Sequence, residues 1–286
     1  MTPFPPLTRR GALALGVSAL LPALAPRGAR AQDARAPRFV TSELILTETA
    51  LALGISPLAA GNLPLYRRLV GVPALPDGLH DLGPLNEPNM ELLVHLAPDL
   101  IIAADWQRGP QAALERIAPV LWLETMPFSR PGLEIATDLA RKIAEAGQIS
   151  ADDLVTGFDR ARNRLSRAIA SRNPPPVLLA RFLEDGRHAL VFTEGSLPGD
   201  LLAGAGGRNA LPGSGPPGAL PLGLSEILAT GAPILATGPL PQGALFTRVI
   251  ESGALRAIPL PPVFPAGGLA SATRLADALT TGIGLI

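Results

Sequence analysis

The sequence predicts an α/β protein with two Rossmann-like lobes joined by one long, rigid helix. Three observations lead to this prediction: apolar runs alternate with amphipathic segments, one long amphipathic segment occupies residues 150–171, and patterns of the first half recur in the second. The 286 residues are 47% hydrophobic and 17% charged. This proportion of apolar side chains is enough to bury the core of one large or two moderate domains.

Six apolar runs have the length and composition of buried strands. They are Leu100–Ala103, Val120–Leu123, Val177–Ala180, Ala189–Phe192, Ile234–Ala236 and Ala257–Leu260. Amphipathic segments separate the runs, and a helix between two strands is the usual connection in a parallel sheet. We therefore expect mainly parallel sheets covered by helices.

Residues 150–171 have the pattern of one continuous helix, which would be about 33 Å long at about 1.5 Å per residue. Asp152 and Asp153 begin the segment, arginines fill its second half, and three consecutive prolines after it prevent its continuation. Its apolar residues recur at spacings of three and four, namely Leu154, Phe158, Ala161, Leu165 and Ile169.

This helix lies near the middle of the chain, so we take it as the connection between two lobes. The predicted parts are an N-terminal lobe at residues 32–149, a linking helix at 150–172 and a C-terminal lobe at 173–286. An ordinary long helix within a single domain is the alternative.

Two sequence patterns occur once in each half of the chain. Glu91 and Glu226 are each followed by two apolar residues and, seven residues on, by a proline. Glu48 and Asp200 are each followed, six residues on, by a glycine. Glycine after a short helix is a common C-terminal cap, and proline before a strand ends the helix ahead of it. The recurrence predicts that both halves share one plan, and chance resemblance is the alternative.

The first 31 residues have the pattern of a signal peptide. Arg9 and Arg10 precede an uncharged apolar run at residues 11–26, and Ala29-Arg30-Ala31 fits a cleavage site between small residues. The paired arginines favour the twin-arginine export route, and general secretion is the alternative. The apolar run is too short to span a bilayer and contains a proline. We therefore expect an exported, soluble protein of the periplasm.

The composition excludes several kinds of site and partner. The chain has no cysteine, so it has no disulfide, no thiolate metal site and no lipid-bearing N-terminal cysteine. Residues 1–31 hold four arginines and no acidic residue, so 20 basic and 24 acidic residues remain and the net charge of residues 32–286 is −4. A net negative charge disfavours nucleic acid, which binds basic surfaces.

Motifs of enzymes and of metal sites are missing from the sequence. His80, His95 and His188 each lack a second ligand at helical spacing. Neither a nucleophile elbow nor a phosphate-binding loop occurs, and the glycine cluster at residues 204–207 follows a predicted helix instead of a strand. We therefore predict neither an enzyme nor a resident cofactor. An enzyme on a doubly wound fold, with catalytic groups scattered along the chain, is the alternative.

Aromatic and arginine side chains follow several of the predicted strands, where the crevice of an open α/β sheet lies. Rings give contact area with little loss of rotamer entropy, and guanidinium groups donate forked hydrogen bonds. These residues are candidates for binding a planar or anionic ligand, and solvated surface loops are the alternative. They are Tyr66, Arg67 and Arg68 in an early loop, Trp106, Gln107 and Arg108 after the run at 100–103, Arg181 after 177–180, and Phe264 after 257–260.

Several stretches resemble the substrate-binding proteins of iron-siderophore, haem and cobalamin importers, above all the ferric-hydroxamate branch. The most specific stretch is Glu87-Pro88-Asn89-Met90-Glu91-Leu92-Leu93, and weaker matches include Tyr66–Arg68, Arg116–Pro119, Leu190–Phe192 and Gly206–Ala210. The resemblance implies the class III periplasmic binding protein fold, in which one long helix joins two α/β lobes, the cleft between them is shallow and little hinge motion accompanies binding.

The resemblance also implies capture of a ferric siderophore and its delivery to an ABC permease in the inner membrane, with iron held by the chelator alone. Glu91 and Glu226 occupy the positions at which one acidic residue of each lobe docks on the permease. Where the hydroxamate branch carries a ligand-gripping arginine, this chain has Leu85. Haem, cobalamin or another organic ligand is therefore an alternative, a sensor module is a third possibility, and a monomer is expected.

Overall fold

The computed structural model describes residues 37–126, 129–211, 213 and 218–286. The described residues form one compact unit, and the segment predicted as a signal peptide, residues 1–31, lies outside them. Within the described part of the chain, every helix is too short or too polar to cross a membrane.

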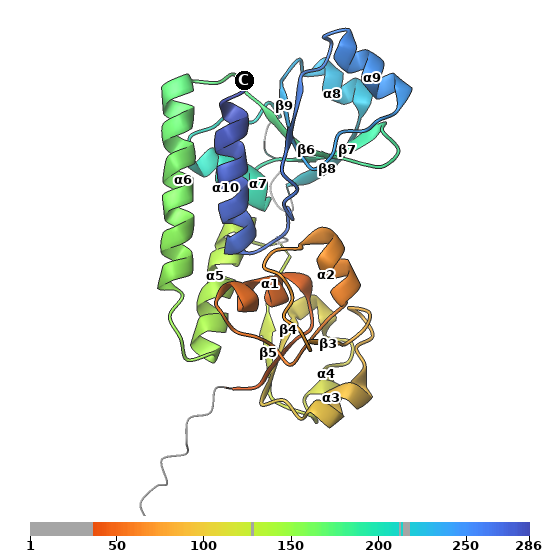
Figure 1. Cartoon of the computed structure of the whole chain (residues 1–286), viewed down its shortest axis with the longest axis vertical. Coiled ribbons are helices and arrows are strands. Elements are labelled where there is room, and N and C mark those ends of the chain that lie inside the picture. Colours follow the sequence, from red (N-terminus) through yellow and green to blue (C-terminus); the bar gives the residue numbers. More distant parts are fainter. Residues whose placement is uncertain (1–36, 127–128, 212, 214–217) are drawn as a thin grey trace, which may run out of the picture. The chain divides into compact units, whose positions relative to one another are not determined.

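The N-terminal lobe is built on a five-stranded parallel sheet of order β3-β2-β1-β4-β5 (Figure 1). Val40 of the central strand pairs with Ile101 of its neighbour, and both side chains are buried. A helix follows each strand, which explains the parallel order. The strands are β1 (Phe39–Thr41), β2 (Ala59–Ala60), β3 (His80–Asp81), β4 (Leu100–Ala104) and β5 (Val120–Leu123); the helices are α1 (Leu44–Ala52), α2 (Leu63–Leu69), α3 (Met90–Leu96), the 3-10 turn η1 (Asp105–Gln107), α4 (Gln111–Leu114) and α5 (Gly132–Ala146).

The C-terminal lobe has a five-stranded mixed sheet of order β10-β9-β6-β7-β8. Its strands β10, β9 and β6 are parallel, whereas β7 is antiparallel to both β6 and β8. The strands are β6 (Leu178–Phe182), β7 (His188–Phe192), β8 (Ala219–Gly223), β9 (Ile234–Thr237) and β10 (Ala257–Leu260); the helices are α7 (Leu197–Gly204), α8 (Leu224–Ala229), α9 (Ala244–Glu251) and α10 (Leu269–Ile283).

The prediction of mainly parallel sheets holds for the whole N-terminal sheet but not for β7, which is antiparallel to both of its neighbours. The connection between β6 and β7 is a tight turn around Gly186, whose φ is +63°, and Asp185 accepts hydrogen bonds from the backbone N–H of Arg187 and His188. A parallel connection needs a crossover of a dozen or more residues. This turn is too short for one, so β7 folds back along β6.

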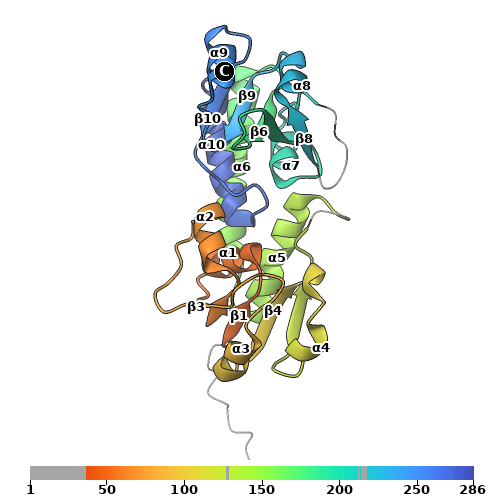
Figure 2. The same cartoon turned by 90° about the vertical axis from the view of Figure 1, so that its right-hand side faces the viewer.

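The long helix α6 (Asp152–Arg172) forms where the apolar spacing predicted it. It ends at Asn173, whose positive φ of 42° stops the helical path before the prolines. Figure 1 shows α10 lying alongside α6, and Figure 2 shows the same fold turned by 90°. The limits predicted for the two lobes, residues 32–149 and 173–286, stay predictions.

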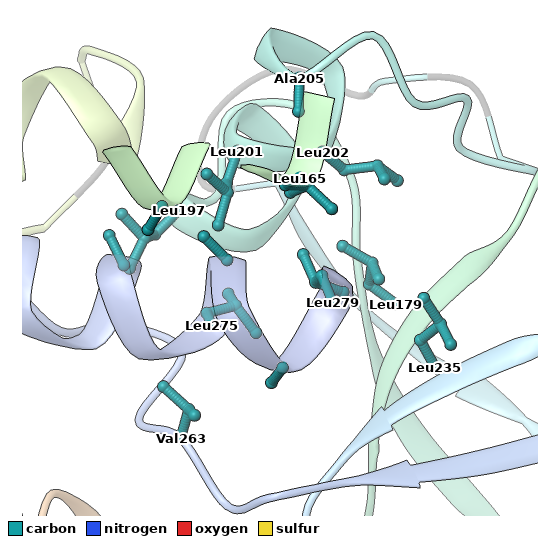
Figure 3. Close-up of a cluster of buried hydrophobic side chains, with 14 of the residues drawn as sticks. Leu165, Leu179, Leu197, Leu201, Leu202, Ala205, Leu235, Val263, Leu275 and Leu279 are labelled. Carbon is teal, nitrogen blue, oxygen red and sulfur yellow. The ribbon is translucent and has the colours of Figure 1, made fainter. Parts of the chain in front are cut away.

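A cluster of leucines joins α6 to the C-terminal sheet (Figure 3). Leu165 of α6 packs with Leu275 and Leu279 of α10 and with Leu179 and Leu235 of the sheet, and all five side chains are buried. Burial of one leucine side chain contributes roughly 1.5–3 kcal/mol. The apolar stripe of α6 is therefore held by the C-terminal lobe.

Helix α5 contributes to the cores of both lobes. Ile135, Leu139 and Ile143 pack with the buried residues of α1 and the N-terminal sheet, whereas Ala136 and Ala140 belong to the cluster of the C-terminal lobe. Residues spaced by three and four lie on one face of a helix, so α5 turns a different stripe to each lobe.

Candidate binding cleft

An apolar cavity of about 180 Å³ lies between the two lobes, at the carboxyl ends of their strands. The crevice at these strand ends is where open α/β sheets bind ligands. We take this cavity and the loops around it as the candidate binding cleft. Its lining includes Ile45, Thr125 and Ile135 from the N-terminal lobe and Ser196, Leu197 and Ala219 from the C-terminal lobe.

Three of the sequence-predicted ligand residues meet in one apolar cluster beside the cleft. Tyr66 is 1% exposed and packs with Leu44 and Val70, and the half-buried side chains of Leu85 and Phe264 pack against them. The Tyr66 hydroxyl donates a hydrogen bond to the carbonyl of Pro73 at 2.9 Å, and burial raises the pKa of this phenol. Tyr66 is thus a core residue, and it lies with Arg67 and Arg68 in helix α2 and not in the loop that the sequence predicted, because Asn62 caps a helix there.

Gln107 is buried and ties three loops together. Its Oε1 accepts hydrogen bonds from the Ser42 hydroxyl and from the Ala104 backbone N–H. Its Nε2 donates to the carbonyl of Ser42 at 3.0 Å and to that of Leu85 at 2.6 Å. With its amide fully engaged, Gln107 fixes the loops after β1 and β4 against the segment that carries Leu85.

Trp106 is the aromatic residue best placed to reach a ligand. Its side chain is 37% exposed, and its Nε1 donates to the hydroxyl of Thr125 at 3.1 Å. Thr125 lines the cavity. The indole therefore stands at the rim of the cleft, held by one hydrogen bond.

The four predicted arginines are spread over the surface. Arg108 stacks on the ring of Trp122 at 4.8 Å and donates to Gln111 at 3.1 Å. Arg67 and Arg68 are exposed at the end of α2, and Arg181 is half-buried on β6. Among the described contacts none joins these arginines to the cluster of Tyr66, so their role in binding stays a prediction.

Two buried acids, Glu43 at the N-terminus of α1 and Glu48 within it, were not predicted as site residues. Glu43 is 6% exposed and caps the helix, where its Oε2 accepts a hydrogen bond from the backbone N–H of Ile45 at 2.8 Å. Burial, reinforced by the negative charge of Glu48, raises the pKa of Glu43 from 4.5 to about 7. The available signal was an acidic residue two positions after β1 and directly before an apolar helix, where its carboxylate can accept from the free N–H groups of the first turn.

We expect Glu43→Gln to flatten the pH dependence of stability. The folded protein holds a proton on Glu43 up to about pH 7, whereas the unfolded chain loses it near 4.5. Stability is therefore lost as the pH rises through this window, by up to about 3 kcal/mol for a pKa that rises from 4.5 to about 7. Urea denaturation at several pH values between about 5 and 8 measures the slope, with the exposed Glu145→Gln as control. Burial also raises the pKa of Glu48, so the variant should keep part of the slope of stability against pH. A slope equal to that of the parent would show that Glu43 does not contribute.

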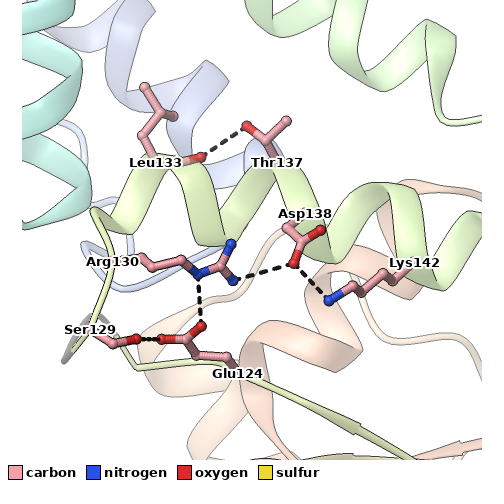
Figure 4. A network of polar contacts seen from close by, with 7 residues as sticks. All are labelled: Glu124, Ser129, Arg130, Leu133, Thr137, Asp138 and Lys142. Atoms are coloured by element: carbon pink, nitrogen blue, oxygen red, sulfur yellow. Dashed lines mark hydrogen bonds and ion pairs between the residues drawn. The ribbon is translucent and has the colours of Figure 1, made fainter.

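A larger hollow of about 810 Å³ lies over α5 and α7, with mixed charges around it. Figure 4 shows its main network. Arg130 pairs with Glu124 at 2.8 Å and with Asp138 at 3.3 Å, and Lys142 pairs with Asp138 at 2.8 Å. The Ser129 hydroxyl donates to Glu124 and, with the pairing to Arg130, lowers the pKa of that carboxyl. These charges satisfy one another, so the hollow offers a ligand no unpaired group from this network.

The two predicted docking residues occupy similar local positions. Glu91 lies in the first turn of α3 and Glu226 in the first turn of α8, and both are exposed. The Oε2 of Glu226 accepts a hydrogen bond from the Gly223 N–H at 2.8 Å. In the described part of the chain no group of three or more His, Asp or Glu side chains is arranged to hold a metal ion.

The chain is similar to known siderophore-binding proteins. It is 31% identical to the iron(3+)-hydroxamate-binding protein FhuD of Escherichia coli (strain K12) over 217 residues, which cover 74% of this chain and 72% of that protein. The siderophore-binding protein FhuD from Vibrio cholerae, bound to Fe3+–Desferal, superposes with a TM-score of 0.76 at 27% identity and covers 87% of this chain and 98% of that one.

More distant structures share the fold. FhuD2 from Staphylococcus aureus with bound ferrioxamine B superposes with a TM-score of 0.64 at 14% identity, covering 86% of this chain and 98% of that chain. At this identity the likeness shows the fold alone. A profile of the family described as "Periplasmic binding protein" matches residues 40–237. The chain therefore belongs to the periplasmic binding protein family.

Proposed function

We propose that this protein is the solute-binding component of an ABC importer, which captures a ferric siderophore of the hydroxamate type outside the inner membrane and delivers it to a permease. The observation that carries the proposal is the similarity to the Escherichia coli iron(3+)-hydroxamate-binding protein over 72% of that protein's length. The cavity between the lobes, at the strand ends, supports it. Iron enters as part of the chelated ligand, and the protein acts as a monomer after export to the periplasm.

The wall of the cleft suggests how the ligand is held. The cavity lining is mainly apolar, with Ile45, Ile135 and Leu197 among its residues, so it offers apolar contact, and Trp106 adds a half-exposed ring at the rim. Rings and aliphatic side chains suit the methylene chains of a hydroxamate siderophore. The same apolar wall also favours another organic ligand such as haem or cobalamin, which is our second candidate.

A thermal-shift series tests the ligand class. The protein is heated with ferrioxamine B, iron-free desferrioxamine B, a ferric catecholate, haemin or cobalamin. A ligand at about 100 times its Kd stabilises the native state by about 2.7 kcal/mol, which corresponds to a rise in Tm of about 5–10 °C for a chain of this size. We expect this rise with ferrioxamine B and a smaller one with the iron-free chelator.

The other outcomes are equally informative. A shift with haemin or cobalamin, and none with ferrioxamine B, would replace the hydroxamate assignment by the second candidate. A shift with the ferric catecholate alone would keep the siderophore class and change the chelating group.

A further inference from the structure

A buried carboxylate of the N-terminal lobe caps a helix of the C-terminal lobe. Glu48, on α1, is 0% exposed. Its Oε2 accepts a hydrogen bond from the backbone N–H of Gly268 at 2.9 Å, and its Oε1 accepts one from the Ser271 hydroxyl at 2.6 Å. Both donors lie at the start of α10, the helix that follows the last strand of the C-terminal sheet, and Arg274 of the same helix lies 3.7 Å from Glu48.

The C-terminal lobe makes the reciprocal contact. Asp200, on α7, accepts a hydrogen bond at Oδ2 from the backbone N–H of Leu133 at 3.3 Å and one at Oδ1 from that of Gly195 at 2.7 Å. Leu133 lies in the first turn of α5, the helix that follows the last strand of the N-terminal sheet. The Gly132 N–H donates to the Gly195 carbonyl at 3.2 Å and strengthens this junction.

The two carboxylates occupy matching positions in the two halves of the chain. Glu48 and Asp200 are the acids of one recurring pattern, in which a glycine follows six residues later. Those glycines, Gly54 and Gly206, have φ values of +79° and +86°. Each acid lies on a helix of its own lobe and caps the helix that follows the last strand of the other lobe. The arrangement of the two acids is therefore reciprocal, although α1 follows the first strand of its sheet and α7 the second of its own.

Glycines allow the close approach at both junctions. A Cβ at Gly267 would lie 2.6 Å from Glu48 Oε2 and 2.4 Å from Ser271 Cβ. A Cβ at Gly132 would lie 2.7 Å from the backbone nitrogen of Leu197. Contacts under about 3 Å require an atom to shift: at Gly132 this is the backbone of Leu197, and at Gly267 the side chains of Ser271 and Glu48 that form the junction, so both positions favour glycine.

The cavity of the binding cleft lies between the two junctions. Its lining includes Gly132 and Leu197 from the junction at Asp200, and Ile45 and Gly267 from the junction at Glu48. We propose that Glu48 and Asp200 are a matched pair of positioning residues, which hold the N-terminal lobe and the C-terminal lobe at the separation that the binding cleft requires. The proposal concerns the protein without its ligand and goes beyond the proposed function.

The chemistry of the donors gives the pair a distinctive response to amide substitution. Glu48 accepts from one N–H and one hydroxyl, and a hydroxyl can turn to accept from an amide nitrogen, so Glu48→Gln keeps both hydrogen bonds. Asp200 accepts from two backbone N–H groups, which can only donate and cannot become acceptors. Asp200→Asn therefore leaves one N–H facing an amide NH2, so that one hydrogen bond is lost.

The proposal can be tested by double electron–electron resonance, which measures the distance between one spin label on each lobe. The chain has no cysteine, so spin labels attach only at His95→Cys on α3 and Arg248→Cys on α9, both at exposed positions. We expect one narrow distance distribution for the labelled full chain and for Glu48→Gln. Glu48→Ala, Asp200→Ala and Asp200→Asn should broaden it about twofold, since the junction opens locally. Glu145→Gln, an exposed acid on α5, is the matched control.

The width of the distance distribution distinguishes a role in positioning the lobes from a role in overall stability. A role in stability alone would lower the Tm of the variants and leave the distance distribution narrow, and that result would overturn the proposal. If an alanine variant fails to fold, Asp200→Asn and Ser271→Ala, which removes one donor to Glu48, give the same test. Ferrioxamine B affinity, measured on the same variants, should fall with the broadening. The distances need no ligand, so failure of the proposed function would leave this test intact.

Discussion

Uptake of radiolabelled ferrioxamine B is expected to fall to background when Glu91 and Glu226 are both replaced by arginine. Each acid is exposed in the first turn of a short helix, one in each lobe. In the proposed docking, each acid pairs with a basic group of the permease, so reversal turns two attractions into repulsions. Loss of one close charge pair costs about 2–5 kcal/mol, and two such losses weaken docking by more than about a thousandfold.

Two controls isolate docking from other effects. Glu145→Arg with Glu251→Arg makes the same change of charge at exposed positions of α5 and α9 and should leave uptake unchanged. Glu226→Gln keeps an oxygen for the Gly223 N–H and removes only the charge. Uptake is measured in cells that lack the native copy, and ferrioxamine B binding is measured on the purified variant. Normal uptake by the double arginine variant would show that these acids are not the docking residues.

Gly199→Ala is expected to lower the free energy of unfolding by more than about 4 kcal/mol, a large share of the about 5–15 kcal/mol of a typical domain. A Cβ at this position would lie 1.9 Å from the carbonyl oxygen of Thr193 and 2.2 Å from its carbonyl carbon. Both atoms belong to the backbone just after β7, so the clash can be relieved only if α7 moves away from it. This helix carries the buried Leu201 and Leu202 and the carboxylate of Asp200.

The same substitution in α6 should have the opposite sign. Gly157 lies inside α6, and nothing is within 4 Å of a Cβ built there. Alanine favours a helix interior over glycine by about 0.5–1 kcal/mol, so Gly157→Ala should stabilise the protein. Urea denaturation followed by circular dichroism compares the two variants with the parent. Equal stability of Gly199→Ala and the parent would contradict the close packing of α7 on the end of β7.

The elements that the sequence predicts well are those with strong local patterns. The six apolar runs form strands and the spacing of residues 150–171 forms α6, because a buried strand needs an unbroken apolar run and a half-buried helix needs an apolar stripe at spacings of three and four. Strands β2 and β3 have two residues each, which is too short for any periodicity. Strand β8 contains a proline, which weakens a strand pattern.

Side-chain direction explains what could be predicted of the site. The sequence predicts Tyr66, Trp106 and Gln107 as ligand-binding residues near strand ends; Trp106 is half-exposed and donates to Thr125 of the cavity lining, whereas Tyr66 and Gln107 are buried. It does not reveal that Tyr66 and Gln107 turn inward while Trp106 reaches the rim. The sequence singles out Glu48 only as the acid of a recurring pattern and does not reveal that it is fully buried, since its donors come from a distant part of the chain.

The capping of α10 by Glu48 also bears on the order in which the protein is made. Glu48 and Gly268 are 220 residues apart in the sequence. Ribosomes add about 5–20 residues per second, so Gly268 is synthesised about 10 to 45 s after Glu48. During this interval only water can donate hydrogen bonds to the Glu48 carboxylate in place of Gly268 and Ser271. The face of α1 that carries Glu48 therefore stays exposed. A nascent chain stalled before residue 268 should therefore present an open N-terminal lobe to chaperones, however complete its sheet.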